Sequence, residues 1–116
     1  MDQTLKPHEI IMVDTASSDN SLLTARLFPS VQLIAQERNT GFARGNNLAI
    51  EAVFAESKWI ALINPDALPE PRWLEELLVA AESNLGFDVF GSKLVNSADP
   101  TLFDGAGDAY HVSGLV

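Results

Sequence analysis

Hydrophobic residues along this chain fall into two alternating patterns. Short apolar runs rich in β-branched side chains predict strands that are buried on both faces, and they cover residues 9–13, 31–36 and 59–63. Stretches with apolar side chains at helical spacing predict helices, and they cover residues 21–28, 42–56 and 72–83. Strands that alternate with helices through short connections indicate right-handed βαβ crossovers and a mostly parallel sheet. We therefore expect an α/β fold of three layers, with helices on both faces of the sheet.

The alternating pattern weakens after residue 84. Residues 87–95 predict one more strand, bent at Gly91, while residues 101–116 contain several glycines and no helical spacing. A chain of 116 residues has the size of one ordinary domain. Such a domain buries about two thirds of the surface that its unfolded chain exposes. We expect a single partial domain over residues 1–116 with one compact core.

Charge and composition exclude several classes of function. The formal net charge of −9 repels nucleic acid and anionic membrane surfaces, so we expect neither as a partner. The chain has no cysteine, which excludes disulfides, thiolate metal sites and cysteine nucleophiles. Its first residues are polar, and no apolar run approaches the ~18 residues that a membrane span needs. We therefore expect a cytoplasmic protein with no membrane segment in this chain.

Polar loops follow the first three predicted strands, at the sheet edge where parallel α/β folds bind ligands. Asp14 follows the first strand, where its carboxylate either accepts hydrogen bonds from a nucleoside or caps the next helix. In the second loop, Gly41 and Arg44 lie where a helix begins, and the free amides of that helix would favour a diphosphate. The structural alternative is that Gly41 supplies a left-handed turn and Arg44 is a surface residue. The stretch matches neither the dinucleotide-binding pattern nor the P-loop.

The third loop, Asn64-Pro65-Asp66, ends a predicted strand abruptly. Pro65 cannot donate a hydrogen bond to a sheet and biases Asn64 away from helix, so Asp66 is presented just beyond the strand. One aspartate on a short rigid loop suits Mg²⁺ or Mn²⁺, because these ions take their other ligands from water and substrate phosphates. An ordinary Asn-Pro-Asp turn would explain the same residues.

These three loops, in this order and spacing, resemble the nucleotide-sugar-binding half of family 2 inverting glycosyltransferases of the GT-A fold, particularly rhamnosyltransferase-like members. The similar stretches are VDTASSDNS (13–21), RNTGFARGNN (38–47) and LINPDALPEPRWLEEL (62–77). The resemblance implies a Rossmann-like domain that binds a nucleoside-diphosphate sugar through a divalent metal. It also implies transfer of the sugar to an acceptor hydroxyl with inversion.

Seven site residues follow from this resemblance, position by position. Asp14 is expected to contact the nucleoside, and Asp66 to ligate Mg²⁺ or Mn²⁺ on the diphosphate. The residues expected to shape the pocket under the nucleotide are Asn39, Gly41, Arg44 and Asn47. Asn64 takes the first place of the family's D-x-D-like motif, where an acidic residue is usual, so one carboxylate is left for the metal.

The chain departs from the family pattern at both ends. Family members begin with a strand and helix that this sequence lacks, and their catalytic base lies in an acidic motif that would fall beyond Val116. We therefore expect an incomplete glycosyltransferase domain that contains no identified catalytic residue and is inactive alone. Loss of the first strand would expose a sheet edge, which invites a homodimer.

Two other interpretations stay open. The first is a non-catalytic remnant or interaction module of the same fold, which would bind no nucleotide. The second is a receiver-like signalling domain with Asp66 as phospho-acceptor, although a receiver has an acidic pair where this chain has a single aspartate after its first strand. Labelling of Asp66 by a small phosphodonor would identify a receiver.

Overall fold

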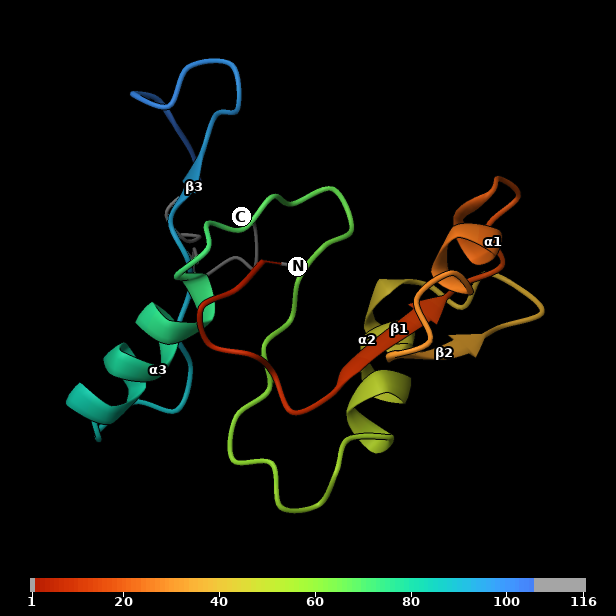
Figure 1. The fold of residues 1–116 in the computed structure, drawn as a ribbon, viewed down its shortest axis with the longest axis horizontal. Coiled ribbons are helices and arrows are strands. Elements are labelled where there is room, and N and C mark those ends of the chain that lie inside the picture. Colours follow the sequence, from red (N-terminus) through yellow and green to blue (C-terminus); the bar gives the residue numbers. More distant parts are fainter. Residues whose placement is uncertain (1, 106–116) are drawn as a thin grey trace, which may run out of the picture. The chain divides into compact units, whose positions relative to one another are not determined.

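The computed structural model describes residues 2–105, and the chain divides into two compact units (Figure 1). One unit is Leu5–Pro69, and the other joins Met1–Thr4 to Glu70–Val116. The buried hydrophobic residues of the described chain are Ala25 and Ala81. This core is smaller than the compact core expected from the sequence. The expected single partial domain stays a prediction.

Within Leu5–Pro69, the predicted βαβ unit is confirmed by β1 (Ile10–Asp14), α1 (Ser21–Ala25) and β2 (Val31–Ala35). The two strands pair in parallel, and Asp14 lies beside Ala35 at the end of the ladder (Figure 1). Helix α1 contacts both strands. The carboxyl ends of both strands therefore lie at one edge of the sheet.

Helix α2 (Phe42–Glu51) packs against one face of β1 and ends before residue 56, where the sequence predicts its end. The helix lies against this strand at the buried Gly45, where a Cβ would lie 3.3 Å from Thr15 Cγ2 and 3.9 Å from Val13 Cγ1. Because side chains alternate along a strand, Met12 points to the opposite face, where it lines a hollow together with residues of α1. Helices on both faces of the strand pair agree with the predicted layers.

The predicted strand over residues 59–63 is not formed in this structure. Trp59, Ile60 and Leu62 lie outside any strand and are 46, 47 and 54% exposed. A strand requires a neighbour that satisfies its backbone groups, and within residues 2–105 β1 pairs with β2 alone. The predicted parallel sheet is therefore present as a single strand pair. The apolar composition of residues 59–63 is not enough to form a strand, because it does not supply a neighbouring strand to pair with.

The second unit contains α3 (Trp73–Ser83), β3 (Leu94–Val95) and β4 (Phe103–Gly105). The helix confirms the prediction for residues 72–83. Strands β3 and β4 pair in antiparallel fashion, so the strand predicted over residues 87–95 is reduced to its last two residues. The Trp73 Nε1–H donates to Ser92 Oγ at 2.7 Å and joins the helix to the segment that precedes β3.

The amino-terminal segment of the chain caps α3. Gln3 is 3% exposed although it is polar. Its Nε2 donates to the Glu70 carbonyl at 2.8 Å, and its Oε1 accepts from the Leu74 amide at 3.1 Å. The first amides of a helix have no partner within the helix. A side chain from a distant part of the sequence therefore satisfies one of them.

The neighbouring Thr4 donates a hydrogen bond to the Glu75 carboxylate. A hydrogen bond of 2.9 Å from Thr4 Oγ1, together with Arg72, holds the pKa of Glu75 below its ordinary value. We expect Thr4→Val to raise the pKa of Glu75 toward that value, as measured by NMR titration of its carboxyl carbon.

The lowered pKa of Glu75 determines how its contribution to folding stability changes with pH. The contribution of Glu75 to stability is present above its unfolded pKa and is lost as the pH falls through the lower folded pKa. Thr4→Ser keeps the hydroxyl and is the matched control. An unchanged pKa of Glu75 in Thr4→Val would contradict the assignment.

Candidate functional site

Asp14 ends β1 and is 4% exposed. Its Oδ2 accepts a hydrogen bond from the Ser17 amide at 3.2 Å, and its carbonyl accepts one from the Gln36 amide at 2.8 Å. Inside this turn Ala16 has a φ of 63°, in the left-handed region. Asp14 thus stabilises the turn after β1. The sequence offered capping of the next helix as its structural alternative, and that role is not observed, because the N-cap residue of α1 is Asn20. The contact of Asp14 with a nucleoside stays a prediction.

Asn39 and Gly41 form the turn that starts α2. Asn39 Oδ1 accepts from the Gly41 amide at 2.9 Å, and Gly41 has a φ of 82°. The Gly41 carbonyl accepts from the Gly45 amide at 3.0 Å, which begins the helix. The left-handed turn proposed as the alternative for Gly41 is therefore confirmed. Because Gly45 lies against Thr15, this loop reaches the same end of the sheet as Asp14.

A substitution at Gly41 tests the importance of this turn. We expect Gly41→Ala to lower the free energy of unfolding by about 1 kcal/mol, because an L-residue is strained at positive φ. The strain arises from the backbone, since no atom of the described residues lies within 4 Å of the added Cβ. Gly86→Ala is the matched control, because its Cβ also meets no atom of residues 2–105 within 4 Å and its φ is outside the left-handed region. Urea denaturation measures both, and an equal loss at Gly86 would contradict the explanation.

Arg44 and Asn47 lie together on the exposed side of α2. They line a hollow of about 340 Å³ with Ala43, Leu48 and Glu51. The helix thus brings two predicted site residues together and adds a carboxylate, Glu51, that the sequence reasoning missed. Its spacing of two helical turns from Arg44 is the signal that could have revealed it.

Asn64 and Asp66 are exposed in the loop that ends the Leu5–Pro69 unit. The Ala67 amide donates to the Asn64 carbonyl at 3.1 Å, which closes a turn with Pro65 and Asp66 at its corner. The turn that the sequence offered as an alternative is therefore confirmed. Among residues 2–105, no group of three His, Cys, Asp or Glu side chains could hold a metal.

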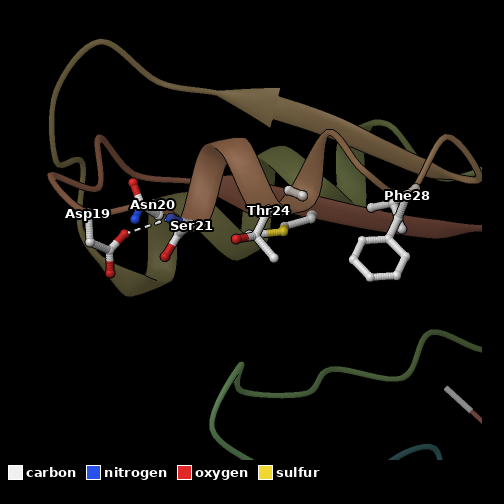
Figure 2. Close-up of a pocket in the computed structure, with 8 residues that line it drawn as sticks. Asp19, Asn20, Ser21, Thr24 and Phe28 are labelled. Carbon is white, nitrogen blue, oxygen red and sulfur yellow. Dashed lines mark hydrogen bonds between the residues drawn. The ribbon is translucent and has the colours of Figure 1, made fainter.

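A larger hollow, of about 550 Å³, opens beside α1 (Figure 2). It is polar near Asp19 and apolar near Phe28, and none of the predicted site residues lines it. Its lining comprises Met12, Asp19, Asn20, Ser21, Thr24, Ala25, Phe28 and Val31. Hydrogen bonds from Ser21, one of them 2.8 Å from its amide, hold the pKa of Asp19 below its ordinary value. This carboxylate therefore shapes the start of α1.

The sequence of this chain is similar to a known protein family and to two known proteins. A family model described as "Glycosyl transferase family 2" matches residues 1–106. An uncharacterized glycosyltransferase of Haemophilus influenzae is 26% identical over 98 residues, which cover 81% of this chain and 30% of that protein. The succinoglycan biosynthesis protein ExoO of Rhizobium meliloti is 32% identical over 100 residues, which cover 84% of this chain and 26% of that protein. No solved structure matches this chain.

The chain therefore spans under a third of the length of these relatives, 30% of one and 26% of the other. In the described range, residues 2–105, no helix has both the length and the apolar character required to cross a bilayer.

Proposed function

Because the chain belongs to glycosyl transferase family 2, we propose that it binds a nucleoside-diphosphate sugar for transfer of the sugar to an acceptor hydroxyl with inversion. The observation that carries the proposal is the parallel pairing of β1 and β2. This pairing brings Asp14 and the loop that starts α2 to one edge of the sheet. Ligands of parallel α/β sheets bind at that edge.

The start of α2 is proposed to hold the diphosphate. Among residues 2–105, no side chain caps the start of α2, whose N-cap residue is Gly41, so the first amides of the helix would be available to a ligand. These amides and the helix dipole favour an anion. Arg44 lies in the first turn and would add a guanidinium, which pairs strongly with phosphate oxygens. Asn47 would contribute amide hydrogen bonds from the next turn.

The nucleoside is proposed to lie against the turn after β1. The Asp14 carboxylate uses Oδ2 to hold the Ser17 amide, and its second oxygen would accept a hydrogen bond from the nucleoside. The Asn39 side chain, which holds the Gly41 amide, would keep the backbone of the adjacent loop in place beneath it.

Asp66 is proposed to bind Mg²⁺ or Mn²⁺. A single carboxylate at the corner of an exposed turn fits an ion that keeps several waters and binds substrate phosphates, and the Asn64 amide oxygen is a further ligand of the right type. When bound, such a metal supplies positive charge that stabilises the nucleoside diphosphate as it leaves. Asn64 and Asp66 would orient the ion. We assign no catalytic base, and a cytoplasmic location stays a prediction.

Calorimetric titration tests this proposal. The whole chain is titrated with uridine and deoxythymidine diphosphates and their sugars, with and without Mn²⁺. We expect binding that depends on the metal. The absence of binding at millimolar ligand would instead support the non-catalytic remnant. The family match favours either of these over a receiver-like domain, for which labelling of Asp66 by a phosphodonor would be required.

A further inference from the structure

The loop that starts α2 contains a buried hydroxyl group without a hydrogen-bond partner. Thr40 Oγ1 is buried from solvent, and it forms no hydrogen bond with any residue in the range 2–105. Thr40 as a whole is only partly buried, so the hydroxyl is shielded more completely than the rest of the residue. Buried polar atoms of folded proteins are nearly always hydrogen-bonded, and an exception requires an explanation.

Hydrogen bonds fix the backbone on both sides of Thr40. Asn39 Oδ1 accepts from the Gly41 amide at 2.9 Å, and this bond spans Thr40. The Gly41 carbonyl accepts from the Gly45 amide at 3.0 Å, which ties the loop to α2. A shift of the loop that carried the Thr40 hydroxyl to a partner would break these bonds. Rotation about the Cα–Cβ bond of Thr40 leaves them intact.

The same loop offers hydrogen-bond donors that suit an anion. Thr40 directly precedes Gly41, the N-cap residue of α2, and no side chain among the described residues caps this helix start. Free amides and the helix dipole favour a phosphate at such a position. A threonine hydroxyl has one proton to donate. A phosphate bound at the start of α2 would therefore supply an acceptor where Thr40 has none.

We propose that Thr40 Oγ1 donates a hydrogen bond to a phosphate oxygen of the nucleoside diphosphate after rotation about its Cα–Cβ bond. This inference rests on the proposed function and adds to it a residue that the family resemblance did not supply. A buried hydroxyl without a partner destabilises the free protein, and binding of the ligand removes this unfavourable contribution. A bound water would satisfy the same hydroxyl, but its loss would not weaken phosphate binding.

Calorimetric titration of the whole chain tests the contact, with uridine diphosphate and inorganic pyrophosphate as ligands in the presence of Mn²⁺. Thr40→Val removes the hydroxyl and keeps the shape of the side chain. We expect it to raise both dissociation constants about tenfold, the order of effect of a hydrogen bond to a charged group. Thr40→Ser retains the hydroxyl and should bind both ligands as the unsubstituted chain does. Thr24→Val, at an exposed position of α1, is the matched control and should leave binding unchanged.

The possible failures of the two proposals give different results. Uridine diphosphate that binds equally well to Thr40→Val would overturn this inference and leave the proposed function standing. A loss confined to uridine diphosphate would place the hydroxyl against the nucleoside and overturn the phosphate contact. No binding of either ligand by the unsubstituted chain at millimolar concentration would reject the proposed function and this inference with it.

The stability of the free chain provides a second measurement that requires no ligand. Because Thr40 Oγ1 has no partner within residues 2–105, Thr40→Val breaks no hydrogen bond of the described fold. Replacing an unsatisfied buried hydroxyl with a methyl group removes the unfavourable burial of a polar atom. We therefore expect an unchanged or higher midpoint of urea denaturation. A clearly lower midpoint would show that the hydroxyl has a partner in the free protein and would overturn the proposal.

Discussion

Asp66→Ala should abolish the Mn²⁺-dependent part of nucleoside diphosphate binding. Asp66 is the one carboxylate of the Asn64-Pro65-Asp66 turn, and no group of three metal-binding side chains exists among residues 2–105 to replace it. We expect the dissociation constant to rise at least about tenfold, equivalent to roughly 1.4 kcal/mol. Calorimetry with Mn²⁺ and the diphosphate measures the change.

Two further variants separate metal binding from a general effect of charge. Asp88→Ala removes another exposed carboxylate, from the other unit, and should leave binding unchanged. Asn64→Asp adds a second carboxylate to the turn and should tighten binding of Mn²⁺, since divalent ions bind more strongly as ligand charge increases. Metal-dependent binding that survives in Asp66→Ala would place the metal elsewhere.

Gln3→Ala should lower the free energy of unfolding of the α3 unit by about 2 kcal/mol. The substitution leaves the Glu70 carbonyl and the Leu74 amide without the side-chain partners that Gln3 provides at 2.8 and 3.1 Å. An unsatisfied buried polar group costs about 1–3 kcal/mol. Urea denaturation followed by Trp73 fluorescence measures the loss, in a Trp59→Phe background that removes the other tryptophan of the chain.

The choice of replacement distinguishes hydrogen bonding from packing at this position. Gln3→Met has a similar length but cannot form either hydrogen bond, so it should be nearly as destabilising as Gln3→Ala. Gln3→Glu keeps an acceptor for the Leu74 amide but loses the donor to the Glu70 carbonyl when it is ionised. Its stability should therefore partly recover at low pH. Unchanged stability in Gln3→Ala would show that the cap contributes nothing.

The parts of the fold that sequence reasoning predicted correctly depend on neighbours in the chain. Helices α2 and α3 follow from the helical spacing of their apolar side chains, and each begins within one residue of the predicted start. The left-handed turn at Gly41 follows from a residue type that tolerates positive φ, next to an Asn39 side chain able to hold its amide. Such interactions span a few residues, so they can be inferred from the order of residues alone.

The site was predicted less completely than the elements that carry it. Asp14 and the Asn39 loop were placed correctly at one sheet edge, because the carboxyl ends of parallel strands meet there. Glu51 was missed, since a carboxylate at helical spacing is usually a solvated residue. The hollow beside α1 was also missed, because its shape depends on how Met12 and Phe28 pack.

Local chemistry thus decides where the helices and turns of this chain form, and where each turn places its polar side chains. Tertiary structure decides the two features that depend on residues far apart in the sequence. Gln3 is buried because its side chain meets the start of α3, which is distant along the chain. Residues 59–63 have the composition of a strand and form none, because a strand is completed by hydrogen bonds to a neighbour, and the described part of β1 pairs only with β2.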